Sequence, residues 1–177
     1  MQPVIYDVAV SADGFICGAG EDISAFAAQG PIVEDYRARL AGYACAIMGR
    51  STYCFGYRFG MKPGQNPYPW MRCAVFSASL KLPGRAVELV RGDTLAAVDL
   101  LRRESPGPVY LCGGGAFAGW LLRHGRIQRL RLKRAPVLLG AGVRLFGDHA
   151  RPVALRLLES RAYADGGFFQ DFALGDA

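Results

Sequence analysis

The sequence contains few of the side chains that build metal sites and disulfide frameworks. Its 177 residues include two histidines and an odd number of cysteines, none in C-x-x-C spacing: Cys17, Cys45, Cys54, Cys73 and Cys112. A zinc site or a disulfide framework needs more regular clusters of these residues. We therefore predict no metal site, and we expect a protein of the reducing cytoplasm.

Long apolar stretches and targeting signals are also missing. No apolar run approaches the roughly 18 residues that span a bilayer. Residues 1–7, Met-Gln-Pro-Val-Ile-Tyr-Asp, show neither the basic nor the apolar region of a secretory signal. The dinucleotide fingerprint G-x-G-x-x-G is absent, and neither histidine stands near a serine motif typical of a nucleophilic triad. We expect no membrane partner.

What is present is an ordinary globular composition with one basic segment. Hydrophobic residues make up 51% of the chain and charged residues 20%, and the length suits one domain over residues 1–177. The net charge is +6, and one acid-free segment, residues 123–134, holds six basic residues: Arg123, Arg126, Arg129, Arg131, Lys133 and Arg134. The rest of the chain is therefore balanced.

Within that segment the basic residues alternate with leucines, which is the period of a half-exposed strand. We interpret Arg129, Arg131 and Lys133 first as a solvated strand face. A phosphate-bearing ligand or an acidic partner surface are the alternatives. Recognition of nucleic acid is the weakest interpretation, because no aromatic residues or known binding module accompany the charges.

Along the chain, apolar periodicity and turn residues predict alternating strands and helices, followed by strands alone. Helices are expected from Pro31 through Tyr43, after a cap at Ser51 or Thr52, from Asp93 or Thr94 to Glu104, and over 116–124. Strands are expected over 4–10, 44–48, 73–77, 86–90, 109–112, 128–133, 153–159 and 167–174, with a loop over 60–70. This order predicts an α/β fold with a mostly parallel sheet and an antiparallel edge.

Three consecutive glycines, Gly113–Gly115, connect a buried strand to a helix. Glycines let a ligand approach the backbone, and a helix N-terminus attracts anions, so a pyrophosphate suits this turn. Tight packing of strand against helix is the alternative explanation.

A second turn, Gly49–Thr52, also begins a helix and offers two hydroxyls and the forked guanidinium of Arg50. Ser77 and Ser79 follow another strand, at the sheet edge where open α/β folds bind ligands. Arg50 with Ser77 or Ser79 would bind a ribose 2′-phosphate, which favours NADPH over NADH. A capping serine beside a surface arginine is the alternative.

In this order the motifs resemble the dihydrofolate reductase-like superfamily, and more closely its branch with the riboflavin-biosynthesis reductase domain. The resemblance covers nearly the whole chain and rests on residues 10–16, 47–53, 76–79, 111–117 and 135–146. It implies a three-layer α/β/α fold and an NADPH-dependent reductase acting on a C=N or C=O bond. The implied substrate is a pterin-like or pyrimidine-like heterocycle. It also implies a homodimer formed through the terminal strands.

The resemblance also assigns cofactor contacts by motif. The adenosine side of NADPH falls to Gly49, Arg50, Ser51, Thr52, Ser77 and Ser79. The pyrophosphate and ribose fall to Gly113, Gly114, Gly115, Ala116 and Phe117. Ala9 and Ile16 would lie beside the nicotinamide.

The proton donor is less clearly marked. Dihydrofolate reductases carry a carboxylate on the helix before the Gly-Arg turn, where this chain has Glu34 and Asp35. Those acids also suit compensation of the helix dipole, or a pair between Asp35 and Arg39. Asp7 shares a strand face with Ala9 and is the second candidate for binding or protonating the substrate. Its alternative is a structural hydrogen bond or an ion pair with an arginine.

Two further questions stay open at this stage. The aromatic residues Tyr53, Phe55, Tyr57, Phe59, Tyr68 and Trp70 suit either a wall for a flat heterocycle or packing of a long loop. A non-catalytic nucleotide-binding protein of the same fold is the alternative to the reductase.

Overall fold

The computed structural model describes residues 1–84 and 86–174, and its centre is an eight-stranded sheet with the order β5-β4-β3-β6-β1-β7-β10-β9. Six strands are parallel: β1 (Val4–Ser11), β3 (Cys45–Gly49), β4 (Arg72–Phe76), β5 (Glu88–Val90), β6 (Val109–Gly113) and β7 (Arg129–Ala135). β10 (Phe168–Leu174) runs antiparallel to β7 and to the edge strand β9 (Leu155–Ala162). The predicted parallel sheet with antiparallel terminal strands is confirmed.

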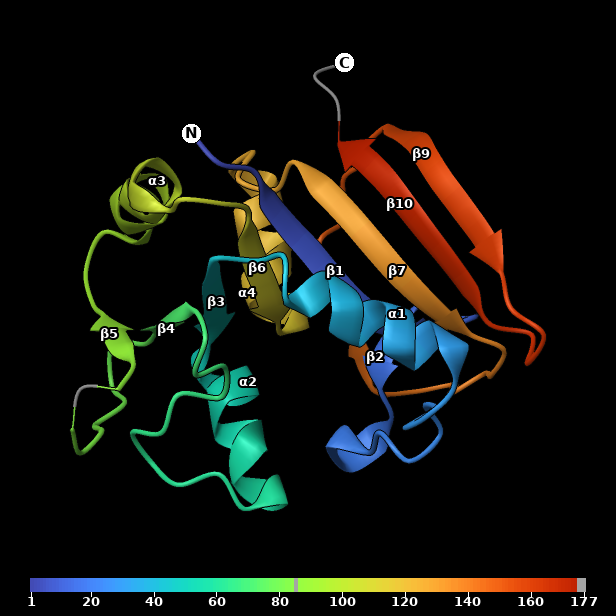
Figure 1. Ribbon diagram of the computed structural model, residues 1–177, viewed down its shortest axis with the longest axis horizontal. Helices are drawn as coiled ribbons and strands as arrows, with labels where there is room; N and C mark the ends of the chain where they lie inside the picture. The colour runs from blue at the N-terminus through green and yellow to red at the C-terminus, as the bar shows by residue number, and fades with distance from the viewer. Residues whose placement is uncertain (85, 175–177) are drawn as a thin grey trace.

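Helices cover both faces of this sheet, as Figure 1 shows. α1 (Pro31–Leu40) and α2 (Arg50–Phe55), continued by η2 (Gly56–Phe59), lie on one face. α3 (Thr94–Glu104) and α4 (Gly115–Arg123) pack on the other. The architecture is the three-layer α/β/α arrangement of dihydrofolate reductase-like proteins.

Two short elements were not predicted by the sequence patterns. β2 (Phe15–Cys17) pairs with β8 (Val143–Arg144) in a separate two-stranded sheet, and η1 (Ala19–Glu21) follows β2. These strands are too short to show alternation, so only the fold brings them together. Within residues 1–84 and 86–174, no helix is long and apolar enough to cross a membrane.

The central strand β1 divides the core into two clusters. Val4, Tyr6 and Val10 pack against α3 and α4, whereas Ile5 packs toward Tyr43 and the α2 side. This is the alternation expected for a strand covered on both faces. Asp7 is the exception in the strand, because it is a carboxylate that is 1% exposed.

The predicted end residues are confirmed for α3 and α4 but not for α2. Asp93 caps α3 by accepting a hydrogen bond of 3.0 Å from the amide of Ala96, and Gly125, with a φ of +63°, follows the end of α4. The prediction that Ser51 or Thr52 caps α2 is wrong. Gly49 is the N-cap residue and no side chain caps this helix.

Close packing of α4 against β8 and the segment after it depends on two glycines. A Cβ atom on Gly115 would lie 2.1 Å from the carbonyl oxygen of Arg144, and one on Gly119 would lie 2.1 Å from that of Phe146. Both distances are far below contact with a backbone atom. Gly115 therefore serves packing, which was one of the two explanations open for the glycine turn.

We expect Gly119→Ala to destabilise the protein by about 2 kcal/mol, because the methyl group displaces the backbone of Phe146 and this overpacking outweighs alanine's gain in helix propensity. Gly42→Ala is the control, since the nearest atom to its new Cβ is the Arg39 carbonyl oxygen at 3.4 Å. Urea unfolding of both variants measures the difference. Equal stability of the two variants would contradict the packing argument.

Candidate active site

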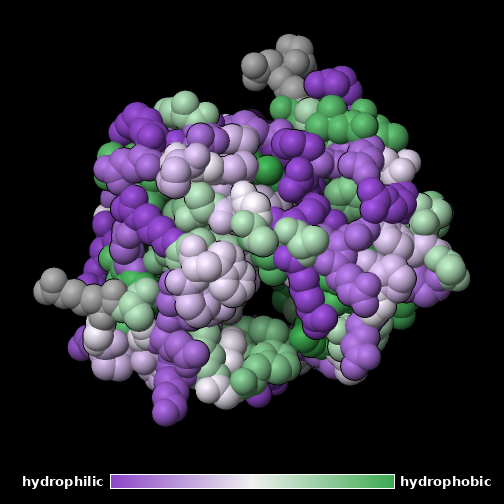
Figure 2. Space-filling model, in the orientation of Figure 1, coloured by the Kyte–Doolittle hydropathy of each residue, from purple (hydrophilic) through white to green (hydrophobic). Residues whose placement is uncertain are grey.

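The two glycine-containing turns meet at the carboxyl ends of β3 and β6. A Cβ on Gly114 would lie 3.0 Å from Thr52 Oγ1, and one on Gly49 would lie 3.3 Å from the Cβ of Phe117. The start of α2 and the start of α4 are therefore in contact. In Figure 2 the surface is hollowed beside them, below α1 and between α2 and β2.

Both helix starts present backbone donors without a capping side chain. Neither α2 nor α4 has a side-chain cap or an acidic residue in its first turn. Gly113 has a φ of +127°, a conformation that favours glycine, and Ala116 is exposed at the start of α4. The first amides of a helix have no partner within it. Together these features suit the binding of an anion.

Arg50 and Ser79 also meet, as the motif order predicted. Arg50 donates a hydrogen bond of 3.2 Å to the hydroxyl of Ser79. Ser77 Oγ accepts hydrogen bonds from the amides of Ser79 and Leu80, at 3.3 and 3.0 Å, and so shapes the turn after β4. Ser51 is exposed in the first turn of α2. One guanidinium and three serine hydroxyls thus lie at the same end of the sheet.

A cavity of about 350 Å³ lies between α1, the segment before it, and the strands β1 and β7. Its lining is Ala9, Ser24, Ala25, Phe26, Ala27, Ile32, Val33, Lys133, Arg134, Ala135, Pro136, Asp165 and Gly167. Of the two residues expected beside the nicotinamide, Ala9 lines this cavity and Ile16 lies in β2.

Asp7 is held in an ion pair beneath α1. Arg39 donates to both carboxylate oxygens, at 2.9 and 3.1 Å, and the Tyr43 hydroxyl donates at 3.0 Å. Asp7 is not part of the cavity lining. The structure thus shows the ion pair with an arginine that the sequence left open as the alternative to proton transfer.

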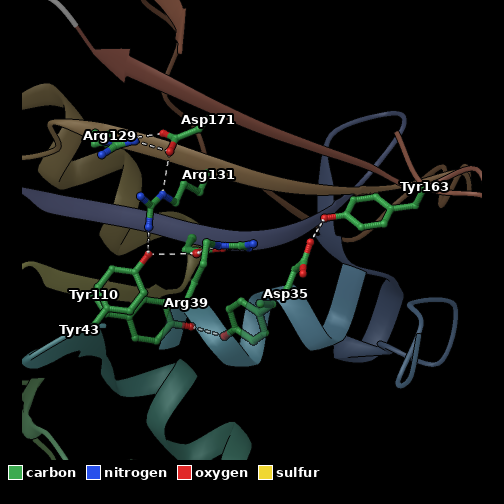
Figure 3. Close-up of polar contacts among 10 residues, drawn as sticks. Asp35, Arg39, Tyr43, Tyr110, Arg129, Arg131, Tyr163 and Asp171 are labelled. Carbon is green, nitrogen blue, oxygen red and sulfur yellow. Dashed lines mark hydrogen bonds and ion pairs between the residues drawn. The ribbon is translucent and has the colours of Figure 1, made fainter. Parts of the chain in front are cut away.

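Asp35 points toward Tyr163, which follows β9, as Figure 3 shows, and it does not line the cavity. It accepts hydrogen bonds of 2.5 Å from the Tyr163 hydroxyl and 2.7 Å from Arg161. The bond from Tyr163 is the main cause that lowers the pKa of Asp35. The predicted pair with Arg39 is wrong, because Arg39 binds Asp7. Glu34, next to it, is exposed.

The interpretation of the basic strand as a solvated face is also wrong. Arg129 and Arg131 both pair with Asp171 of β10, whose side chain is 2% exposed. Arg131 also donates to the Tyr43 hydroxyl at 3.0 Å, which links this cluster to Asp7. These arginines lie on the sheet face that α1 covers, and they neutralise a buried carboxylate.

Lys133 belongs to the same basic strand, and the sequence patterns predicted no separate role for it. It lies opposite Ala9 in the β1–β7 register and lines the cavity. Its Nζ lies 3.2 Å from the centroid of the Tyr36 ring and joins no hydrogen bond or ion pair with the other described residues. The alternation of basic residues with leucines predicts which face of the strand Lys133 occupies. Pairing of β1 with β7 then places Lys133 on the same face as Ala9.

Of the six aromatic residues over 53–70, Tyr53 and Tyr68 support packing of the loop, whereas Phe59 and Trp70 are largely exposed. Tyr53 is 1% exposed, and its hydroxyl donates to the Gln65 carbonyl and accepts from the Gly64 amide, at 2.9 Å each. Tyr68 packs edge-on against Tyr110. None of the six aromatic residues lines the 350 Å³ cavity. The described part of the chain also contains no cluster of three metal-ligating residues.

A family model for the RibD C-terminal domain matches residues 2–169, so the chain belongs to this family. No curated protein sequence matches the chain significantly. Among solved structures, a putative riboflavin biosynthesis protein from Shewanella sp. PV-4 superposes with a TM-score of 0.82, at 20% identity, over 99% of this chain and 100% of that chain.

Two further structures extend the likeness to enzymes. A diaminohydroxyphosphoribosylaminopyrimidine deaminase/5-amino-6-(5-phosphoribosylamino)uracil reductase from Thermotoga maritima matches with a TM-score of 0.74 and 15% identity, over 98% of this chain and 57% of that one. A dihydrofolate reductase from Enterococcus faecalis, complexed with NADP(H) and RAB-propyl, matches with a TM-score of 0.69 and 12% identity, over 98% and 97%. The family and the fold support an oxidoreductase.

We expect Asp7→Ala to lower the free energy of unfolding by about 3 kcal/mol, because it leaves Arg39 without its carboxylate in a mostly buried position. Glu88→Ala is the control, since Glu88 pairs with Arg72 on the surface and such pairs contribute about 1 kcal/mol or less. Chemical denaturation measures both. A cost for Asp7→Ala no larger than that of the control would refute a structural role for the pair.

Proposed function

We propose that this chain is one reductase domain that uses NADPH to reduce a C=N or C=O bond of a small pterin-like or pyrimidine-like heterocycle. One observation carries the proposal: two helix starts without capping side chains meet at the end of the sheet that also holds a cavity lined by Ala9. When bound, NADPH would supply the hydride.

The residues present fit this cofactor. The amides at the start of α4, reached past Gly113 and Gly114, suit its pyrophosphate. Arg50 and Ser79 suit a ribose 2′-phosphate, because a guanidinium binds phosphate oxygens through paired charge-assisted hydrogen bonds. Gly49, next to Arg50, lies against Phe117 in the first turn of α4. The site proposed for the 2′-phosphate is therefore close to the site proposed for the pyrophosphate.

The cavity suits a small, flat substrate. Its volume of about 350 Å³ is at the lower end of the range for ligand sites, and its walls include Phe26, Ile32 and Val33. Relatives in the family and fold are named for reduction of a phosphoribosylaminouracil and of dihydrofolate. Both names support a nitrogen heterocycle as the substrate class. All five cysteines are free, as a reducing cytoplasm would keep them.

We expect the protein to bind NADPH more tightly than NADH, and Arg50→Ala to raise the Kd for NADPH roughly 10- to 100-fold with little effect on NADH, because a charge-assisted hydrogen bond is lost. Titration of nicotinamide fluorescence measures both. Arg103→Ala removes an exposed arginine of α3 and serves as the control.

Turnover separates this proposal from a non-catalytic nucleotide-binding protein. NADPH oxidation is followed with 5-amino-6-(5-phosphoribosylamino)uracil, dihydrofolate and a quinone panel. Binding of NADPH without oxidation on any of these compounds would favour the non-catalytic alternative. Equal affinity for NADPH and NADH would contradict the assignment of Arg50.

We further propose that the protein is a homodimer formed through β9. Every residue of this strand is exposed, it forms the open edge of the sheet, and Leu155, Leu157 and Leu158 project from it. An uncovered apolar edge strand promotes association unless another surface buries it. A second copy of the same strand is a self-complementary partner for it.

We expect light scattering to give a mass of twice 19.1 kDa for the wild type and a single chain mass for Leu157→Glu, because a charge on each copy would be buried at the interface. Leu100→Glu adds the same charge to an exposed leucine of α3 and should leave the dimer intact. A monomeric wild type at micromolar concentration would refute the dimer.

A further inference from the structure

Hydride transfer to a C=N or C=O bond requires a proton for the neighbouring nitrogen or oxygen. The two carboxylates first considered for this role are engaged elsewhere, Asp7 by Arg39 and Asp35 by Tyr163. Neither lines the cavity. Asp165 does line it, but it is exposed, and one of its oxygens accepts from the Gly167 amide at 3.0 Å. A donor other than these three carboxylates is therefore needed.

Lys133 meets the geometric requirement. It projects from β7 beside Ala9, the strand residue assigned to the nicotinamide, and so reaches the same part of the cavity. Ile32 and Val33 of α1 form the facing wall. The ammonium lies over the Tyr36 ring, which holds it by a cation–π contact and leaves its N–H groups without a described acceptor.

The surroundings of Lys133 make it able to release a proton near neutral pH. Burial lowers its pKa to about 8, and the neighbouring Arg39 and Arg37 act in the same direction. The carboxylate of Asp7 opposes this shift. Burial raises the pKa values of the Cys112 thiol and of the Tyr36 hydroxyl, so both stay neutral.

We propose that Lys133 donates the proton that accompanies hydride transfer in this cavity. The inference rests on the proposed reductase function. As the hydride reaches the carbon of the C=N or C=O bond, an Nζ–H bond of Lys133 breaks and an N–H or O–H bond forms on the substrate. NADPH is oxidised, the double bond is reduced, and the neutral amine of Lys133 regains its proton from water. A general acid whose pKa lies near the working pH is well matched to this task.

The first test needs no substrate. The chain contains three lysines, and Lys62 and Lys81 are exposed, so they are internal references. Acetylation by trace acetic anhydride is measured for each lysine by peptide mass spectrometry between pH 6 and pH 11. We expect half-maximal reactivity of Lys133 at about pH 8, well below the roughly 10.4 of a lysine side chain in a model peptide. A Lys133 that does not react, or that titrates with the references, would overturn the proposal.

The second test is turnover on the compounds that the wild type reduces. We expect Lys133→Met to lower kcat about 100-fold or more, with the Kd for NADPH unchanged, because general acid catalysis is lost. Wild-type kcat should fall tenfold per pH unit above about 8, where the ammonium loses its proton, and this dependence should disappear in Lys133→Met. Lys81→Met is the control and should match the wild type.

Lys133→Arg separates proton donation from a purely electrostatic effect, because it keeps the charge but does not release a proton near neutral pH. We expect it to be as slow as Lys133→Met. Wild-type turnover together with a fast Lys133→Met or Lys133→Arg would overturn the role of Lys133 and leave the reductase standing. A wild type that neither binds nor oxidises NADPH would overturn both.

Discussion

Two carboxylates buried between α1 and the sheet, Asp7 and Asp171, constrain the rest of the structure. An unpaired carboxylate in such a position is costly, so the fold must bring arginines to it. Arg39 comes from α1, whereas Arg129 and Arg131 come from β7. The Tyr43 hydroxyl joins the two groups by donating to Asp7 and accepting from Arg131. Helix, central strand and terminal strands are thus connected by one polar network, which sets where α1 lies over the sheet.

The position of α1 in turn defines the cavity. Ile32 and Val33 form its wall on the helix side, and Ala9 and Lys133 form its floor on adjacent strands. The network ends at Asp7, which precedes Ala9 by two residues on the same face of β1. The carboxylate of Asp7 is paired with Arg39, so Lys133 has no ion-pair partner among the described residues. The same network therefore explains why the acid nearest the proposed hydride site is not available as a proton donor.

The sequence predicted the fold well, because alternation in β1 and glycine at the turns are local signals that tertiary packing preserves. The family resemblance assigned the Gly49–Thr52 and Gly113–Gly115 turns to one cofactor, and in the structure they follow the neighbouring strands β3 and β6. The sequence did not predict the partners of Asp7 and Asp35, since these depend on residues 32 and 126 positions away. The alternation in β7 correctly predicted that Arg129, Arg131 and Lys133 share one face. It did not predict that this face is buried, because the burial depends on α1 and Asp171, which are distant in the sequence.

The charge of this buried layer is unequal. Two carboxylates face three arginines and Lys133, so the layer under α1 carries an excess of positive charge. Such an excess disfavours one more ammonium, and Arg39 of this layer acts in the same direction as burial on the pKa of Lys133. It also favours negative charge that develops on a substrate atom as a hydride arrives, because charges that the fold holds in place need no rearrangement. Part of the net charge of +6, which taken alone suggests a nucleic-acid partner, therefore lies on the sheet face beneath α1.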